Sequence, residues 1–321
     1  MMKNKIFNII FSLCFIFHSI NVYAYKITVI SQDKKKFNIF TEKFKSYGND
    51  KYNIEVKNIE RDYPQEQYDK YLKTTNPDLV VLVDNVSLEL HKKFNQDNKM
   101  IKGVSVLSLS VSNSLEDSKG IMGIRYEVPL FSIISSFNFV FKKKIKKIAC
   151  IFRNSFSGDQ IELAKKHLSL TGVKLDFFDV DSSGQEITEN GLSSIIDKIK
   201  KDKKYDAIWV TLDAKLFTQK LFSNFWLPIS KNVKIPFITN ESFFASKEIN
   251  FATLAVSPNI YDLSDQAFQL VRHILQGKVN LTDLKIEENI SVNTYVNTLK
   301  ARLNNLEVRD NLSKTEVYTI E

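Results

Sequence analysis

Polar side chains follow several expected β-strands of this chain, at the points where those strands end. Two kinds of binding chemistry are open to such residues. Free backbone N–H groups at helix starts suit a carboxylate, whereas the carboxylates Asp213 and Glu241 suit an ammonium group. Tyr126 supplies an aromatic ring for an apolar part of a ligand. We expect the ligand-binding residues to be Ser31, Gln32, Asp84, Asn85, Ser110, Ser112, Tyr126, Asn154, Ser155, Asp213, Asn240 and Glu241.

Helix capping is the alternative role for these residues, because Ser, Asp and Asn are favoured at the first position of a helix. For any one segment, capping is the more frequent role. Taken together, however, the segments would line one cleft, and a cleft lined with polar groups is typical of a small-molecule site.

Signals for catalysis are sparse. The sequence contains no Walker loop and no GxGxxG, HExxH or GxSxG motif. His91, His167 and His273 fall in separate expected helices, where we expect surface or helix-end roles rather than catalysis or metal binding. The chain is therefore predicted not to be an enzyme and to use neither a cofactor nor a metal.

An alternation of strands and helices must position the polar residues. Expected strands in the first half are 25–30, 52–56, 77–83 and 104–109, with helices near 37–47, 65–72 and 87–95. In the second half, expected strands are 145–152, 173–180, 206–211, 235–239 and 251–256, with helices near 129–141, 157–170, 191–200, 216–225 and 261–276. This pattern predicts an α/β fold of two doubly wound parallel-sheet lobes. Ligands bind such sheets at the carboxyl ends of the strands.

The length of 321 residues suits two lobes. We place the N-terminal lobe at 25–123, completed by part of 257–290, and the C-terminal lobe at 124–256, completed by part of 291–321. No long linker separates them, which favours two lobes that face one cleft.

The first 24 residues have the pattern of a signal peptide. A short cationic start precedes an apolar stretch at 6–20 that is short for a membrane span. Val22 and Ala24 fit a signal peptidase site, so we expect cleavage after Ala24 and an exported, periplasmic protein. An uncleaved anchor is the alternative, and a lipoprotein is disfavoured because no small residue precedes Cys14.

The net charge of +8, from 45 Lys and Arg against 37 Asp and Glu, could suggest nucleic-acid binding. Cleavage would remove Lys3 and Lys5 and lower this charge by two units. The remaining basic runs, 34–36, 142–147 and 200–204, lie in turns or at helix ends, where lysine is favoured. They lack the interleaved aromatics of nucleic-acid grooves, so no nucleic-acid partner is predicted.

Cysteine content excludes a disulfide-rich scaffold, since the chain has two cysteines. Cys14 would leave with the signal peptide. Cys150 then stands alone in an apolar strand, where we expect a buried thiol.

The second half resembles substrate-binding proteins of ABC transporters, of the kind that includes tryptophan- and tyrosine-type binders with a type I periplasmic-binding fold. The matching stretches are 120–124, 146–155, 205–213, 235–242, 261–277 and 293–306. Each stretch is a weak signal alone, but their order and spacing over about residues 100–310 are fairly specific. The chain is therefore identified as a divergent member of this group.

The sequence departs from the family pattern at the expected site. Asp84-Asn85 replaces a frequent "GT", Ser110-Val111-Ser112 replaces an "SDP" loop, and Asn240 replaces an Asp. The resemblance implies a monomeric protein that closes on a small organic ligand, with an amino acid as one candidate, and delivers it to an ABC permease. The alternative is a periplasmic sensor subunit that regulates a membrane receptor kinase or cyclase. An exported enzyme is a third and weaker hypothesis.

Overall fold

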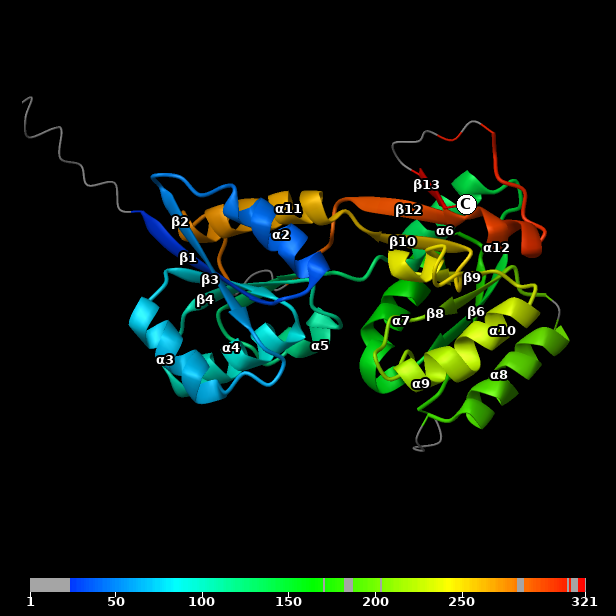
Figure 1. Ribbon diagram of the computed structural model, residues 1–321, viewed down its shortest axis with the longest axis horizontal. Coiled ribbons are helices and arrows are strands. Elements are labelled where there is room, and N and C mark those ends of the chain that lie inside the picture. The colour runs from blue at the N-terminus through cyan, green and yellow to red at the C-terminus, as the bar shows by residue number, and fades with distance from the viewer. Residues whose placement is uncertain are drawn as a thin grey trace, which may run out of the picture.

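The computed structural model describes residues 24–169, 171–181, 187–202, 204–281, 286–310, 312 and 317–320. The expected signal peptide lies outside these residues, apart from Ala24 at its end. None of the helices in the described part of the chain is long and apolar enough to cross a membrane. Two lobes lie side by side along the long axis of the molecule (Figure 1).

The first lobe is built on a fully parallel six-stranded sheet in the order β11-β5-β4-β3-β1-β2. Its strands are β1 (Tyr25–Gln32), β2 (Tyr52–Ile59), β3 (Leu79–Val83), β4 (Lys102–Val106), β5 (Ile121–Ile124) and β11 (Ile286–Glu287). All of β3 is buried, as its continuous apolar sequence predicts for a central strand covered on both faces.

Helices cover both faces of this sheet (Figure 1). On one face lie α2 (Lys35–Lys45) and α11 (Ile260–Leu275), and on the other α3 (Gln65–Thr75), α4 (Asn85–Asp97) and α5 (Val111–Leu115). The α2 and α11 helices are far apart in sequence but pack together, with the Phe44 and Phe268 rings 5.7 Å apart. At Gly123 on β5, an added Cβ would lie 2.7 Å from Val111, so glycine allows α5 its close approach.

The second lobe contains a seven-stranded sheet in the order β13-β12-β10-β9-β8-β6-β7. Its strands are β6 (Lys147–Phe152), β7 (Lys174–Asp179), β8 (Ala207–Val210), β9 (Phe237–Thr239), β10 (Leu254–Pro258), β12 (Val292–Asn297) and β13 (Val317–Ile320). The α6 (Leu130–Val140) and α7 (Asn154–Leu168) helices pack on one face, and α8 (Glu189–Asp202) packs on the other. The predicted α/β fold with two parallel-sheet lobes is confirmed.

Short segments complete the second lobe. They are α9 (Gln219–Leu221), the π-helical η1 (Phe222–Trp226), α10 (Leu227–Asn232), the 3-10 turn η2 (Ser242–Ala245) and α12 (Thr298–Leu303). The single helix expected at 216–225 is therefore a succession of α9 and η1 that continues into α10. Trp226 ties this succession to the loop before it, because its buried indole N–H donates to the Leu216 carbonyl at 2.7 Å.

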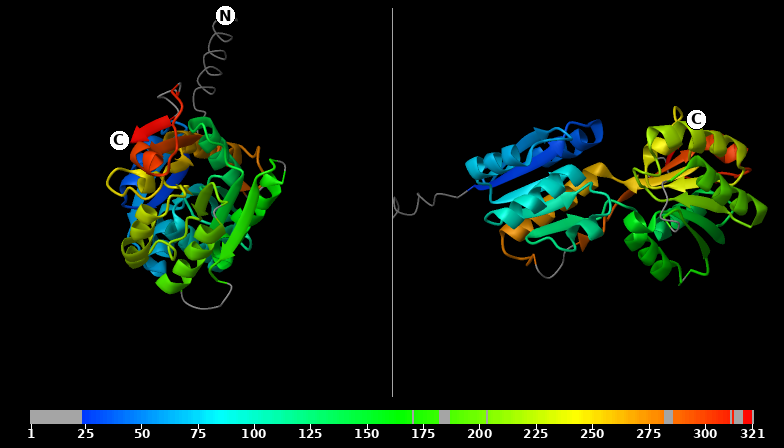
Figure 2. Two further views of the ribbon diagram at one scale, coloured as in Figure 1. Left: turned by 90° about the vertical axis from the view of Figure 1, so that its right-hand side faces the viewer. Right: turned by 90° about the horizontal axis from the view of Figure 1, so that it is seen from below.

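The chain passes between the lobes at 125–129, at Asn259 and at 288–291. Figure 2 shows these connections as the narrow waist of the molecule. They also explain the antiparallel β10–β12 pair, an exception to the parallel pattern. The β10 strand leaves the second lobe where β12 returns to it, so these two neighbours must run in opposite directions.

Two buried residues, Cys150 and His91, test predictions made from the sequence. Cys150 is a buried free thiol, as predicted, and burial raises its pKa. The expected surface or helix-end role of His91 is wrong, because this side chain is fully buried. Its ring bonds the Tyr68 hydroxyl at 3.1 Å and the Ile101 carbonyl at 3.0 Å. Burial lowers the pKa of His91 to about 4, so it is neutral at pH 7.

Candidate functional site

The carboxyl ends of the strands carry most of the predicted site residues. In the first lobe they follow β1, β3, β4 and β5, and in the second they follow β6, β8 and β9. The two edges meet. Lys36 of the first lobe bonds Glu241 of the second at 2.7 Å, and the Ser110 hydroxyl donates to the Phe156 carbonyl at 2.6 Å.

Asp84 is buried and caps α4. One carboxylate oxygen accepts from Ser87 N at 2.7 Å, and the other accepts from Gln32 N at 3.0 Å. Burial raises the pKa of this carboxyl, an effect that these hydrogen bonds partly offset. The Ser31 hydroxyl, on the same edge, donates to the Gln32 carbonyl at 2.9 Å. Both oxygens of Asp84 therefore hold β1 and α4 together.

Asn85 joins the loops that follow β3 and β4. Its amide donates to the Leu109 carbonyl at 2.7 Å, and its side-chain oxygen accepts from Leu109 N at 2.9 Å. This reciprocal pair uses both ends of the amide group. Like Asp84, Asn85 orders the edge of the first sheet.

Ser110 is where the β4 loop touches the second lobe. It has a φ of 53°, in the left-handed region, and its hydroxyl bonds to Phe156 as described above. Its backbone N–H donates to the Glu127 carboxylate. Two residues later, the Ser112 hydroxyl is a buried group without a hydrogen-bond partner.

Glu127 was not among the predicted site residues, yet it lies in the first connection between the lobes. It is 2% exposed. Its Oε1 accepts from Ser110 N and, at 3.2 Å, from Gln160 Nε2 of α7, while its Oε2 has no partner. Burial raises the pKa of Glu127 to about 7, with Asp159 adding to the rise and Arg125 opposing it. The sequence signal was an acidic residue in the Tyr126–Pro129 segment between two apolar elements.

Tyr126 and Glu241 form the most direct inter-lobe contact among the predicted residues. The buried Tyr126 hydroxyl donates to Glu241 Oε2 at 3.0 Å. Lys36, in the first turn of α2, donates to the same carboxylate oxygen and to the Tyr126 hydroxyl. Its ammonium also lies 4.3 Å from the centroid of the Tyr126 ring. Burial and the Glu241 charge raise the pKa of Tyr126, so its phenol stays protonated.

Asp213 lies at the end of β8 and binds Arg153 at the end of β6. The guanidinium Nε and Nη2 donate to the two carboxylate oxygens at 2.7 and 3.2 Å. Arg153 also donates to the exposed Ser155 hydroxyl at 2.9 Å. The Ser155 hydroxyl in turn donates to Asp181, and Asn154 N donates to Asp179 at 3.1 Å.

Asn240 is buried, and both ends of its amide group are bonded. The Trp209 indole N–H donates to its oxygen at 3.1 Å, and its nitrogen donates to the Val128 carbonyl at 2.7 Å. The residue therefore ties β8 and β9 to the first connection between the lobes.

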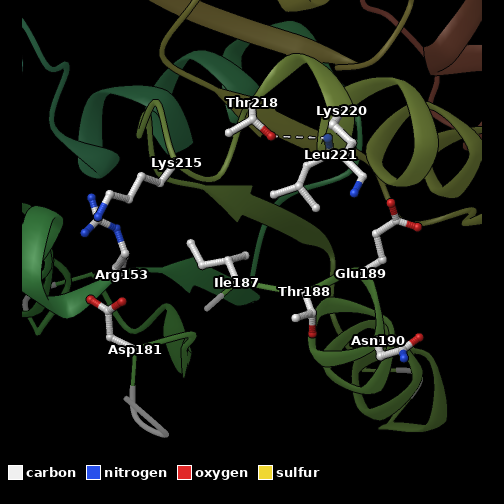
Figure 3. Close-up of a pocket in the computed structure, with 10 residues that line it drawn as sticks. All are labelled: Arg153, Asp181, Ile187, Thr188, Glu189, Asn190, Lys215, Thr218, Lys220 and Leu221. Carbon is white, nitrogen blue, oxygen red and sulfur yellow. Dashed lines mark hydrogen bonds between the residues drawn. The ribbon is translucent and has the colours of Figure 1, made fainter. Parts of the chain in front are cut away.

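A cavity of about 710 Å³ lies beside the Arg153 cluster, entirely within the second lobe (Figure 3). Arg153 and Asp181 stand on one side, and Glu189 and Lys220 on the other. A second cavity of about 740 Å³ lies within the first lobe, next to Asn85. Neither of these two cavities spans the two lobes. The lobes meet at the contact of Lys36 with Glu241 and at the contact of Ser110 with Phe156.

Metal-ligating side chains do not cluster in the described ranges, where no group of three His, Cys, Asp or Glu residues could hold an ion. The described side chains between the lobes form charged and neutral hydrogen bonds.

No family model matches this chain, and no curated protein sequence matches it. Solved structures do. The ligand-free, open structure of a substrate binding protein with adhesive properties from Clostridium difficile is similar at 17% identity with a TM-score of 0.66, over 93% of this chain and 99% of that chain. An ABC domain in complex with L-Trp from Streptococcus pneumonia is similar at 16% identity with a TM-score of 0.59, over 93% and 100%.

A conserved domain protein from Vibrio cholerae is similar at 14% identity with a TM-score of 0.59, over 93% of this chain and 100% of that chain. At such identities the likeness concerns the fold. The chain has the fold of type I periplasmic binding proteins, as the sequence resemblance implied.

Proposed function

We propose that this chain is an exported solute-binding protein that closes its two lobes on a small organic ligand and delivers it to an ABC transporter. One observation carries the proposal. Polar side chains from the facing strand ends already bind one another across the lobes, through Lys36, Tyr126 and Glu241. A ligand held at these edges would contact both lobes and so favour their closed arrangement.

The solved structures support the same role. Two of them are described as a substrate binding protein and as an ABC domain with bound L-Trp. An amino acid carries an ammonium group, which suits the carboxylate of Glu241 and the hydroxyl oxygen of Tyr126. We therefore include amino acids first among the ligands to be tested.

Five of the twelve predicted ligand contacts fall into two groups. Asp84, Asn85 and Asn240 have side chains committed to hydrogen bonds within the protein, so we assign them the ordering of the strand ends. Tyr126 and Glu241 lie at the contact between the lobes. We propose these two as ligand contacts.

Binding and closure are measured on the chain from Tyr25 onward. A thermal-shift screen with amino acids and small organic acids should find a stabilising ligand, and small-angle scattering should then show a smaller radius of gyration with that ligand. Glu241→Gln should weaken binding, and Glu248→Gln, at an exposed glutamate of the same lobe, should not. If no ligand in a broad screen stabilises the protein, the proposal is wrong.

Export and the partner are tested separately. Expression of the full chain in a Gram-negative host should yield a periplasmic protein whose first residue is Tyr25; retention of residues 1–24 would favour the anchor. Genes for a permease and an ATPase beside this gene would support transport. A gene for a receptor kinase or cyclase there would favour the sensor alternative.

A further inference from the structure

We propose that Tyr126 and Glu241 form an ammonium-binding site between the lobes and that Lys36 is its tethered occupant. A ligand with a primary ammonium group would enter by displacing the Lys36 side chain. This inference rests on the proposed function, because it concerns what the inter-lobe site binds and how the protein itself limits that binding.

The geometry around the Lys36 ammonium is that of a ligand site. Its Nζ lies 2.7 Å from Glu241 Oε2 and donates to the Tyr126 hydroxyl, so it stands at the hydroxyl edge of the ring, 4.3 Å from the ring centroid. The Tyr126 hydroxyl donates to the same Glu241 oxygen at 3.0 Å, which fixes the carboxylate against the ring. A carboxylate oxygen beside a phenol oxygen gives an organic ammonium group two hydrogen-bond acceptors, one of them charged.

The receiving groups are better fixed than the occupant. Tyr126 is 3% exposed and belongs to the first connection between the lobes, and Glu241 directly follows β9. The Lys36 side chain is 32% exposed and reaches the site from the first turn of α2 on a flexible four-carbon stem. Holding such a stem in one geometry costs rotamer entropy, and at 32% and 21% side-chain exposure the pair is partly screened by solvent. Lys36 can therefore be displaced.

The ligand class follows from the surroundings of the site. Phe243, two residues after Glu241, is an exposed ring at 55% of its surface. It offers an apolar face close in sequence to the carboxylate. We therefore test a primary ammonium ligand that also carries an aromatic body, for which this exposed ring is a candidate contact.

A tethered occupant lowers the apparent affinity for such a ligand. The apparent dissociation constant is the intrinsic constant divided by the fraction of molecules in which the site is free. If Lys36 fills the site in about nine molecules of ten, its removal tightens binding about tenfold. An ordinary structural ion pair predicts the opposite sign or no change.

The test uses 2-phenylethylammonium and 3-phenylpropanoate as probes, because they differ chiefly in the charged group. Calorimetry is done on the chain from Tyr25 onward, with Lys36→Met, Lys36→Gln as a second variant, and Lys35→Met as the matched control at an exposed neighbour. We expect Lys36→Met and Lys36→Gln to bind 2-phenylethylammonium about tenfold more tightly or better, with Lys35→Met unchanged. Adding Glu241→Gln to Lys36→Met should remove that gain.

Three results would overturn the inference: unchanged or weaker ammonium binding in both Lys36 variants, an equal gain for 3-phenylpropanoate, or no ammonium binding by Lys36→Met at all. Failure of the proposed function looks different. If the proposed function fails, no ligand from the broad screen stabilises any variant. If instead an acidic ligand binds and closes the lobes, the solute-binding proposal stands and only the ammonium site is refuted.

Discussion

Asp213 holds Arg153 by both carboxylate oxygens, at 2.7 and 3.2 Å, across the ends of β6 and β8. The carboxylate is 1% exposed and the guanidinium side chain 12% exposed. The hydrogen bonds that Arg153 donates to Asp213 raise the pKa of Arg153. The same arginine orders the Ser155 hydroxyl at 2.9 Å, so one ion pair sets the shape of the second lobe's strand-end edge.

Asp213→Asn should destabilise the protein. The substitution leaves a largely buried guanidinium without its charged partner, and breaking such a pair costs about 3 kcal/mol. Urea unfolding followed by circular dichroism measures the loss. Asp197→Asn is the matched control, because its pair with Lys200 at 3.5 Å is exposed and should contribute almost nothing. Equal losses in the two variants would contradict the assigned role of Asp213.

Asn240→Ala should also destabilise the protein. The change leaves the buried Trp209 N–H and the Val128 carbonyl without partners, and each unsatisfied group costs about 1–3 kcal/mol. Thermal unfolding should therefore show a clearly lower midpoint than in the wild type. Asn154→Ala is the control at an exposed position of the same lobe. A wild-type midpoint in Asn240→Ala would show that its amide is free to serve a ligand.

The hydrophobic pattern predicted the fold well. Continuous apolar runs such as Leu79–Val83 suit central strands between two layers of helices, and β3 is such a strand. Capping residues also follow from local sequence, as Asp84 shows at the start of α4. The strand ends were thus located before their contacts were known.

The contacts between lobes could not be predicted in the same way. Lys36 and Glu241 are 205 residues apart, and nothing in either local sequence pairs them. The run of lysines at 34–36 predicts only a solvated helix start. The burial of Glu127 escaped prediction for the same reason, because Ser110 and Gln160 approach it from two different lobes.

Glu127 should make stability fall as pH rises from about 5 to 7.5. Its folded pKa of about 7 is above the ordinary value of 4.5, so the folded state holds the proton that the unfolded state has lost. The stabilisation is complete below the unfolded pKa and is lost as pH passes the folded pKa. About two pKa units correspond to about 3 kcal/mol. Urea unfolding at pH 5 and 7.5 measures the change.

Glu127→Gln should remove this component of the pH slope, since the amide does not titrate. Glu66→Gln, at an exposed glutamate of α3, should keep it. If Glu127→Gln retained the wild-type slope, the proton would have to reside on another group.

Lys300 should produce a slope of the opposite sign at alkaline pH. Its side chain is buried, with Nζ donating to the Ser230 carbonyl at 2.6 Å and to its hydroxyl at 3.2 Å. Burial and, secondarily, the Lys231 charge lower its pKa from 10.5 to about 8. Between these values the unfolded state binds the extra proton, so stability rises with pH.

Comparison of the wild type with Lys300→Met isolates that effect. From pH 7.5 to 9.5, the wild type should gain about 2 kcal/mol relative to the variant, which corresponds to roughly one and a half pKa units. Lys247→Met, at an exposed lysine of the same lobe, should follow the wild type. Urea unfolding at the two pH values supplies the difference. Parallel pH curves for the wild type and Lys300→Met would show that the Lys300 ammonium keeps its ordinary pKa, because solvent reaches it despite its burial in α12.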